Sequence, residues 1–596
     1  MPDIKERSEI DDKDKWDLSD LFQNDADWEI AFSGIDEFLA PLQKLKGTLG
    51  NSAEILADCI KLDDQLDREL GRIHTYAHLK SDENTADAHY MGMQDRIRSL
   101  YSQASAELSW IRPEILSIDE SILTGFLETD ILLEYKRAIE LILRNKAHTL
   151  SPPEENLLSL VSEPLSVSSK TFSLLNNADL EFPIVKNDQG EQQRLTHGNY
   201  VLFLESKNRD TRQMAFNTMY DTYGKLKNTL AATLDGNVKK NIFYAKARKH
   251  ESALKASLFA DNVEQSVYDG LISAVGNHLD SFYKYVDLRK RCIAVDDLDM
   301  YDIYVPIVPE FDLHVPYEQA CDWVRESVKP LGEHYLAIID KAFSDNWIDV
   351  YENKGKRSGA YSSGSYDSNP YVLMNYQPNL NSVFTLAHEL GHSLHSYLSV
   401  QNQAHIYSQY KIFVAEVAST TNEGLLFDYL MKTTDDPKLK AYLLNHKCDE
   451  IKGTIFRQTM FAEFEKLIHE KAENGVALTP DELCESYYEL NAKYYGPELC
   501  ADKKIALEWA RIPHFYYNFY VYKYATGLSA AEQFVKNILS NDESLKENYL
   551  NFLKAGCSKD PLDILSDAGV DLRKPVVVEN ALRGFGDYVD QLAELI

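Results

Sequence analysis

Long stretches of this 596-residue chain place apolar residues at spacings of three and four, with charged residues between them. The pattern is clear in residues 57–81 (ADCIKLDDQLDRELGRIHTYAHLKS) and again across residues 209–250. Positions with these spacings share one face of a helix that has 3.6 residues per turn. We therefore predict a mainly α protein built from long amphipathic helices.

Strand-like residues are concentrated in two short regions. One is residues 299–308 (DMYDIYVPIV), and the other is residues 359–377 (GAYSSGSYDSNPYVLMNYQ), where glycines, serines and an Asn-Pro pair separate short runs of β-forming residues. We predict that the second region forms a small sheet directly before the next helix. Residues 184–200 (IVKNDQGEQQRLTHGNY) contain a polar, glycine-containing turn and could form a short hairpin.

The length of the chain favours more than one structural unit, roughly two to four. Three prolines and several serines gather in residues 150–172, which suggests a boundary between residues 150 and 200. We therefore divide the chain into an N-terminal helical lobe, residues 1–195, and a second region, residues 196–596.

The net charge limits the partners of the chain. Sixty-two Lys and Arg residues stand against 94 Asp and Glu residues, which gives a formal charge of −32. Such a surface repels phosphate groups at long range, so we expect no nucleic acid and no membrane among the partners. The sequence leaves the oligomeric state open.

No segment resembles a secretion signal or a membrane span. The first 22 residues (MPDIKERSEIDDKDKWDLSDLF) lack an apolar run, and no stretch reaches the ~18 apolar residues that a membrane helix needs. Seven cysteines are scattered without a Cys-x-x-Cys pair, which is typical of reduced thiols rather than of a disulfide framework. We expect a cytoplasmic protein.

Residues 385–395 (TLAHELGHSLH) contain the pattern His-Glu-x-x-His. His388 and His392 are four residues apart, so on a helix both imidazoles can reach one Zn²⁺ ion. Glu389 lies one position round, where its carboxylate can accept a proton from a metal-bound water. This arrangement is typical of a metal-dependent hydrolase.

A catalytic zinc usually takes a third protein ligand, and the residues after the second histidine argue against two classes of enzyme. A third histidine six residues after His392 is ruled out, because that position is Leu398. A glutamate 19 or 20 residues after His392 is also disfavoured, because Lys411 and Ile412 stand there. The third ligand, a His, Asp or Glu, must come from elsewhere in the chain.

A second helical pattern follows in residues 412–430 (IFVAEVASTTNEGLLFDYL). Glu416 and Glu423 lie on one face of it, and Glu416 stands 24 residues after His392. We predict Glu416 as the third ligand. Glu423 or Ser419 would then orient one of the ligand imidazoles.

Six segments spread along the chain form a set: KWDLSDLF (residues 15–22), MYDIYVP (300–306), the region 359–377 described above, HELGHSLH (388–395), FVAEVAST (413–420) and HFYYNFYVYKYATG (514–527). Together they resemble oligoendopeptidase F in the thimet-oligopeptidase-like family of zinc metallopeptidases. The resemblance covers essentially the whole chain.

The resemblance implies two helical lobes that flank a deep substrate channel, with a small β-sheet next to the zinc-binding helices. It implies one zinc ion per chain at the channel floor and cleavage of short oligopeptides at internal bonds. The family's metal ligands carry over onto His388, His392 and Glu416, and its general base carries over onto Glu389. Residues 196–596 would then be the catalytic region.

Contacts with the substrate are also implied by the resemblance. Gly359, Ala360 and Tyr361 match a segment that lies along the cleft and pairs with the peptide backbone as with an added strand. His395 matches a further family position, for which a packed histidine beside the metal site is an equal alternative.

The aromatic segment 514–524 (HFYYNFYVYKY) suits a strand and a helix equally well by its own pattern. In a helix, Tyr517 and Tyr524 fall within roughly 20° of each other around the axis. The resemblance favours the helix and directs Tyr517 and Tyr524, together with His514, toward the zinc. Distant members of the family have a glycine-rich loop between the counterpart of His514 and the tyrosines, and this chain does not. The residues expected to pack in the core instead are Phe515, Tyr516, Phe519 and Tyr522.

The expected reaction is hydrolysis of a peptide bond by zinc-activated water, with Glu389 taking a proton and returning it to the leaving amine. A tyrosine O–H would stabilise the oxyanion. Two other interpretations stay open at this point. The protein could bind peptides without cleaving them, or it could be an aminopeptidase or carboxypeptidase, although no segment identifies a site for a substrate terminus.

Overall fold

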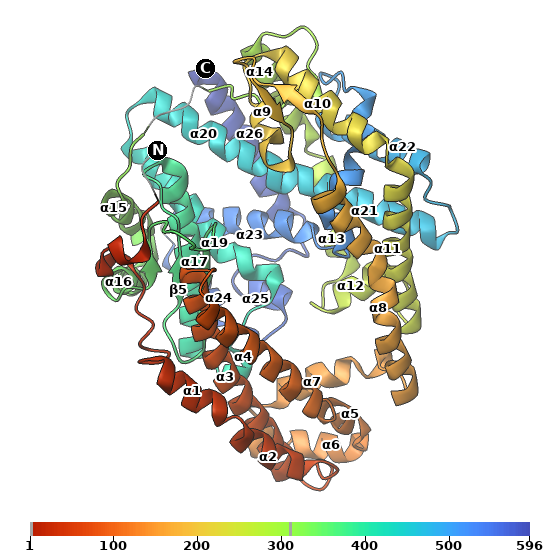
Figure 1. Cartoon of the computed structure of the whole chain (residues 1–596), viewed down its shortest axis with the longest axis vertical. Helices are drawn as coiled ribbons and strands as arrows, with labels where there is room; N and C mark the ends of the chain where they lie inside the picture. Colours follow the sequence, from red (N-terminus) through yellow and green to blue (C-terminus); the bar gives the residue numbers. More distant parts are fainter. Residues whose placement is uncertain (1–3, 309–312, 541) are drawn as a thin grey trace. The chain divides into compact units, whose positions relative to one another are not determined.

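The chain is mainly helical, with α-helices distributed from its N-terminal to its C-terminal part (Figure 1). The computed structural model describes residues 4–308, 313–540 and 542–596. In these residues it contains 26 α-helices, short 3₁₀ and π turns, one two-stranded sheet and one three-stranded sheet. The predicted mainly α fold with a small sheet is confirmed.

Two compact units share the chain, and each is assembled from three separate stretches of sequence. Unit 1 consists of Met1–Ala147, Leu313–Tyr429 and Phe534–Gly569. Unit 2 consists of His148–Asp312, Leu430–Gln533 and Val570–Ile596.

The prolines near residue 150 mark the start of a helix rather than the end of a lobe. Helix α8 (Pro152–Leu174) begins with two prolines and continues through Pro164. Proline suits the first turn of a helix, because it has no N–H to leave unbonded there. The chain passes into unit 2 at residue 148, so the predicted lobes 1–195 and 196–596 do not coincide with these units. The assignment of residues 196–596 as the catalytic region stays a prediction.

Unit 1 packs its N-terminal helices around the long helix α3. The buried side of α3 includes Leu56 and Ile73, and the Trp28 indole of α1 donates a hydrogen bond to the Ile73 carbonyl at 2.8 Å. The helices wholly within unit 1 are α1 (Asp25–Ser33), α2 (Asp36–Leu45), α3 (Ala53–Glu83), α4 (Ala88–Glu107), α5 (Ile111–Ser117), α6 (Glu120–Leu127), α7 (Lys136–Arg144), α15 (Tyr317–Val328), α16 (Glu333–Ser344), α17 (Leu380–Asn402), α18 (His405–Ser408), α24 (Glu543–Lys554) and α25 (Pro561–Asp567).

Unit 2 is built in the same way from amphipathic helices, with α11 packed against α8 and α21. Two helices, α19 (Ile412–Thr433) and α23 (Tyr522–Ile538), carry the chain from one unit to the other. The other helices of unit 2 are α9 (His197–Leu204), α10 (Arg209–Gly224), α11 (Lys227–Ala247), α12 (Ala253–Phe259), α13 (Gln265–Gly276), α14 (Leu279–Ile293), α20 (Pro437–Ile451), α21 (Arg457–Glu473), α22 (Pro480–Tyr495) and α26 (Val576–Leu595).

The two segments in which turn residues separate β-forming runs, residues 184–200 and 359–377, both form β-structure. Strand β5 (Tyr371–Leu373) is buried at the centre of the three-stranded sheet, parallel to β3 (Ile348–Asp349) and antiparallel to β4 (Tyr361–Ser363). The predicted hairpin is also present, because β1 (Ile184–Lys186) pairs antiparallel with β2 (Gln192–Arg194). Strand β4 is a half-buried edge strand, so one side of its backbone is not paired within this sheet.

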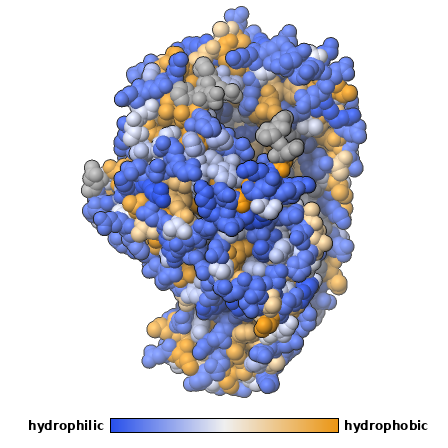
Figure 2. All heavy atoms as spheres, turned by 60° about the vertical axis from the view of Figure 1, so that its left-hand side comes forward, coloured by the Kyte–Doolittle hydropathy of each residue, from blue (hydrophilic) through white to orange (hydrophobic). Residues whose placement is uncertain are grey.

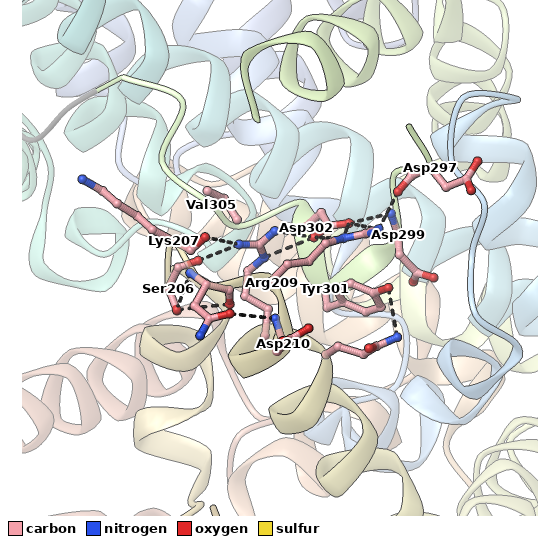
Figure 3. A network of polar contacts seen from close by, with 12 residues as sticks. Ser206, Lys207, Arg209, Asp210, Asp297, Asp299, Tyr301, Asp302 and Val305 are labelled. Carbon is pink, nitrogen blue, oxygen red and sulfur yellow. Dashed lines mark hydrogen bonds and ion pairs between the residues drawn. The ribbon is translucent and has the colours of Figure 1, made fainter. Parts of the chain in front are cut away.

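The expectation of a strand in residues 299–308 is wrong. The chain forms a 3₁₀ turn at Met300–Asp302 there, and none of these ten residues belongs to a strand. Asp302 is fully buried and accepts hydrogen bonds from Arg212 Nη2 at 2.7 Å and Arg209 Nη2 at 2.9 Å (Figure 3). Asp299 caps the turn through the Met300 N–H. Ion pairs with distant residues therefore decide the local conformation, not β-propensity.

The visible surface is mainly hydrophilic. On the face drawn in Figure 2, hydrophilic side chains predominate, and apolar side chains are scattered among them. No helix among the described residues has both the length and the apolar character needed to cross a bilayer. All seven cysteines lie within the described residues, and all are free thiols.

Candidate active site

The predicted metal-binding motif lies on α17, a helix anchored in unit 1 by one apolar side. Asn379 caps the helix by accepting a hydrogen bond from the Ser382 N–H at 2.9 Å, as is usual for asparagine before the first turn. The buried apolar side consists of Val383, Ala387, Leu390, Leu394 and Leu398.

Three predicted ligands come together at one point. His388 and His392 lie on successive turns of α17, with ring centroids 4.8 Å apart. Their Nε2 atoms lie 3.3 Å and 3.4 Å from the same carboxylate oxygen, Oε2 of Glu416 on α19. One ligand atom from each of the three residues lies within 4.8 Å of the others. The structure therefore brings the three residues into a single cluster.

This cluster suits a zinc ion. Two imidazoles and one carboxylate are a common donor set for catalytic zinc, with bonds of about 2.0–2.2 Å. Tetrahedral bonds of that length separate neighbouring ligand atoms by about 3.3–3.5 Å. The two distances to Glu416, 3.3 Å and 3.4 Å, agree with this spacing.

Two side chains on α19 support the ligands. The Glu423 carboxylate lies 2.5 Å from Nδ1 of His388, so the Nδ1–H is directed at Glu423 and Nε2 is the nitrogen that faces Glu416. The Ser419 hydroxyl instead donates to Oε2 of Glu416 at 3.1 Å. Of the two residues predicted to orient an imidazole, Glu423 makes that contact, and Ser419 holds the carboxylate.

The charges of the cluster depend on one another. Burial lowers the pKa of His388, but hydrogen bonds to Glu416 and Glu423 outweigh burial and raise this pKa to about 10. Burial raises the pKa of Glu416, and the hydrogen bonds from His388 and His392 lower it by more, so the net direction is down. The positive charge of His388 and the negative charge of Glu416 therefore stabilise each other.

Glu389, the predicted general base, lies beside the cluster on α17. It is 7% exposed. Burial raises the pKa of its carboxyl, and the neighbouring His388 and His392 oppose this shift without cancelling it. The group is therefore a poorly hydrated carboxyl that sits next to the ligands without being one of them.

Strand β4, with the predicted substrate segment at its start, is attached to α17. The Ser362 and Ser393 hydroxyls lie 2.8 Å apart, which ties the strand to α17, the helix that carries two of the predicted ligands. Gly359 has a left-handed φ of 87° just before the strand, a value that favours glycine. Ala360 is half-buried, and the Tyr361 hydroxyl donates to Asp82 at 2.8 Å. Contacts of these residues with a peptide stay a prediction.

His395 packs in the core of unit 1. It is 1% exposed and stacks on Tyr410, with ring centroids 3.7 Å apart and planes at 2°. Burial, together with the charge of His392, lowers the pKa of His395 to about 3, so this imidazole is neutral. These surroundings are those of a packed histidine, one of the two alternatives considered for His395. A catalytic role for this residue stays a prediction.

The helix expected across residues 514–524 is interrupted. A 3₁₀ turn covers Pro513–Tyr516, a loop follows, and α23 begins only at Tyr522. Asn518 and Phe519 both have left-handed φ angles, 51° and 57°, which no α-helix contains. Tyr517 and Tyr524 therefore do not lie on one helix, and the prediction that they share a helical face is wrong.

The loop nevertheless gathers the same side chains by another route. The His514 ring lies 5.6 Å from Tyr517 and 6.0 Å from Tyr524, both edge to face. Tyr520 lies 5.2 Å from Tyr524. Tyr517 is 58% exposed. These residues belong to unit 2 and the metal ligands to unit 1, so their action on a substrate stays a prediction.

The remaining aromatic residues of the segment are core residues, as predicted. Phe515, Tyr516, Phe519 and Tyr522 are all buried. Tyr516 stacks on Phe172 of α8 at 4.2 Å, and its hydroxyl lies 2.8 Å from Thr233 of α11. The segment therefore divides into buried rings that anchor it and rings that gather around His514.

Comparison with known proteins identifies the family. A family description, "Peptidase family M3", matches residues 202–584, more than half of the chain. This chain belongs to peptidase family M3. A second description, "Oligopeptidase F", matches residues 114–182 of the same M3 peptidase.

Individual relatives match over the full length of the M3 chain. Oligopeptidase PepF of Bacillus subtilis (strain 168) is 47% identical over 594 residues, covering 100% of this chain and 89% of the relative. A crystal structure of a candidate peptidase from Chlamydophila abortus has a TM-score of 0.94 and 36% identity, covering 100% of both chains. Oligoendopeptidase-F from Enterococcus faecium has a TM-score of 0.73 and 39% identity, covering 96% of this chain and 99% of that one. The predicted enzyme class, a metalloendopeptidase, is confirmed.

Sequence reasoning missed Gly391, which sets the distance between the two ligand-bearing helices of this M3 peptidase. A Cβ atom at Gly391 would lie 2.6 Å from the Ser419 Cα and 2.7 Å from the Ala418 carbonyl oxygen. Only glycine allows α17 and α19 to approach so closely. The signal in the sequence was a glycine within the motif itself, between Glu389 and His392.

Asn422 was also missed, and it fixes the same pair of helices. It is fully buried on α19, and its side-chain amide donates to the Ala387 carbonyl of α17 at 3.2 Å. Its amide oxygen accepts from the Tyr335 hydroxyl of α16 at 2.9 Å. A polar residue inside an apolar helical stretch was the available signal, because buried amides are hydrogen-bonded.

Proposed function

We propose that this M3 peptidase is a cytoplasmic zinc endopeptidase that cleaves internal bonds of short oligopeptides. The observation that carries the proposal is the convergence of two Nε2 atoms on one Glu416 oxygen, at 3.3 Å and 3.4 Å. The names of the relatives, oligopeptidase PepF and oligoendopeptidase-F, support an oligopeptide substrate. Seven free cysteines support a reducing compartment.

His388, His392 and Glu416 would hold one zinc ion per chain and leave a fourth position for water or substrate. When bound, the metal supplies Lewis acidity to the scissile carbonyl and lowers the pKa of the attacking water. Glu423 keeps the His388 imidazole turned so that Nε2 faces the site.

Glu389 would move the proton. It neighbours His388 on α17 and does not belong to the ligand cluster. A carboxylate oxygen of Glu389 takes a proton from the water as the new C–O bond forms. The same carboxyl then delivers that proton to the amide nitrogen as the C–N bond breaks, so the leaving group departs as a neutral amine.

Residues of the aromatic segment would stabilise the developing negative charge. The phenol O–H groups of Tyr517 and Tyr524 would donate hydrogen bonds to the former carbonyl oxygen, and His514 lies against both rings. Such donors matter because they interact more strongly with the transition state than with the substrate.

The substrate backbone would bind along β4. Since β4 is an edge strand of its sheet, its unpaired side can accept an extended peptide as a further strand. Gly359 and Ala360 lead into that strand, and Tyr361 begins it. Pairing through backbone groups recognises peptides of many sequences.

The direct test is Glu389→Gln. We expect the variant to keep one zinc per chain and to lose hydrolysis of an internally quenched peptide by about 10²–10⁴-fold, because glutamine cannot accept the proton. Zinc is measured by metal analysis, and turnover by fluorescence. The matched control is Glu470→Gln, an exposed residue of α21, which should change neither quantity.

A peptide blocked at both ends separates the alternatives. Cleavage of the blocked peptide, mapped by mass spectrometry, is expected for an endopeptidase. An aminopeptidase or carboxypeptidase would leave it intact. A wild-type protein that holds stoichiometric zinc and cleaves no peptide would instead be a binding protein, and the proposal would fail.

A further inference from the structure

The loop between Tyr517 and Tyr520 contains two successive residues in the left-handed region. Asn518 has a φ of 51° and Phe519 a φ of 57°. Asparagine tolerates this conformation, but phenylalanine rarely adopts it, because its Cβ crowds the backbone. A conformation of this kind persists only where surrounding groups hold it in place.

Glu465 of α21 holds the backbone of this turn. The Phe519 N–H donates to Oε1 of Glu465 at 2.7 Å, and the whole glutamate side chain is buried, at 0% exposed. Its second oxygen, Oε2, is buried without a hydrogen-bond partner among the described residues. Burial raises the pKa of this carboxyl to about 8, so it is largely protonated at neutral pH.

Further contacts hold the two residues of the turn. The Ser257 hydroxyl of α12 donates to the Asn518 carbonyl at 2.8 Å. The Phe519 ring, 1% exposed, packs 4.4 Å from His469 and 6.0 Å from Tyr268. Burial lowers the pKa of His469 to about 4, so this neighbour is neutral and offers no charge to pair with Glu465.

A buried carboxyl with one unpartnered oxygen is expensive for a folded protein, because its desolvation is not repaid by a second hydrogen bond. An apolar side chain at this position would remove that cost but would leave the Phe519 N–H without an acceptor. The role of the Glu465 carboxyl in the folded protein is therefore to accept the hydrogen bond from one backbone N–H of the strained turn, that of Phe519.

We propose that Glu465 is a positioning residue, which fixes the left-handed turn at Asn518 and Phe519 and thereby the orientation of Tyr517 relative to Tyr520 and Tyr524. Along the chain, the turn lies between Tyr517 and the other two tyrosines. In space, the centroid of the Tyr517 ring lies within 6.5 Å of those of His514 and Tyr520. The centroid of the Tyr524 ring lies within 6.0 Å of the same two. A change of backbone direction at Phe519 would separate them. The effect of Glu465 on catalysis rests on the proposed role of Tyr517 and Tyr524.

The test compares Glu465→Leu with Glu465→Gln. Leucine removes the acceptor, whereas glutamine keeps a carbonyl oxygen for the Phe519 N–H. We expect the leucine variant to lose kcat on the order of 10²-fold with little change in KM, because displaced catalytic groups cost about this much. The glutamine variant should stay close to wild type. Glu470→Leu, on the exposed side of the same helix, is the control and should behave as wild type.

Hydrogen exchange read by mass spectrometry supplies a measure that does not depend on catalysis. Peptides covering residues 514–524 should exchange faster in Glu465→Leu than in wild type, and at the wild-type rate in Glu465→Gln. Unchanged exchange in the leucine variant would overturn the proposal, and so would equal kinetic losses in both variants.

Two further comparisons keep the proposal and the assumed function separate. If Tyr517→Phe and Tyr524→Phe leave kcat unchanged, the catalytic role of the tyrosines fails, while the exchange result still judges Glu465. If Glu465→Leu does not fold, Ser257→Ala removes the second contact to the turn. That variant should accelerate exchange in residues 514–524, whereas Ser281→Ala, which removes a hydroxyl bonded to a carbonyl elsewhere in unit 2, should not.

Discussion

Glu423 acts on the metal site through a single hydrogen bond. Its carboxylate accepts the Nδ1 proton of His388 at 2.5 Å. Replacing Glu423 with alanine should lower zinc affinity by about 10–100-fold, because the imidazole loses both its orientation and part of its basicity. A competition titration against a chelator of known affinity measures the change.

A conservative variant sharpens this prediction. Glu423→Gln keeps an oxygen that can accept from Nδ1 but removes the negative charge. We expect its zinc affinity to lie between that of wild type and that of Glu423→Ala. Equal affinities in all three proteins would show that the contact contributes nothing to metal binding.

At the scale of helices, the crossing of α17 over α19 depends on Gly391. A methyl group there would meet the Ser419 Cα at 2.6 Å and the Ala418 carbonyl at 2.7 Å, both backbone atoms of the helix that carries Glu416. Gly391→Ala should therefore destabilise the protein by about 1–3 kcal/mol, as overpacking typically does, and should weaken zinc binding by moving Glu416 away. Thermal unfolding and the chelator titration measure the two effects.

The matched control is another glycine within a helix. At Gly270 of α13, no atom beyond its chain neighbours and the backbone of its own helix lies within 4 Å of the place where a Cβ would stand. Gly270→Ala should leave zinc binding unchanged and stabilise the helix slightly, because alanine has the higher helix propensity. If Gly391→Ala behaved in the same way, the close approach of the helices would be irrelevant to the site.

Elements whose evidence is local were predictable from the sequence. The spacing of His388 and His392 needs only one helix, and the period of residues 412–430 places Glu416 and Glu423 on one face of a helix. The sheet at β4 and β5 was marked by its own turn residues. In each case the residues that decide the structure lie near one another in the sequence.

Elements decided by distant partners were not predictable. Residues 299–308 have β-forming side chains, but Asp302 is held by Arg209 and Arg212, about 90 residues earlier, and the chain turns instead. The aromatic segment 514–524 is bent at Phe519 by Glu465, which lies 54 residues away. No window of local sequence contains these pairs. The β-forming residues of 299–308 therefore suggested a strand, and the pattern of 514–524 left strand and helix equal until the family resemblance favoured the helix.

For the molecule as a whole, bound metal should contribute to stability. The predicted ligands link α17 to the part of α19 that belongs to unit 1, so a metal that binds only the folded state stabilises it by about 2.7 kcal/mol when its free concentration is 100 times Kd. Removing the metal with a chelator should lower Tm, and faster hydrogen exchange should be confined to α17 and α19. Restoring zinc should reverse both changes. A Tm that does not respond to complete loss of metal would contradict this expectation.

The interleaving of the two units bears on how the protein is made. Each unit draws on an early, a middle and a late stretch of the chain, and the last stretch of unit 1 ends at Gly569 while that of unit 2 ends at Ile596. Domains formed from one continuous stretch can fold while the ribosome is still adding residues behind them. Here neither unit can close its core until nearly the whole chain has emerged, so the growing polypeptide carries unfinished apolar surfaces through most of its synthesis. A stop codon within Phe534–Gly569 would remove part of both units at once.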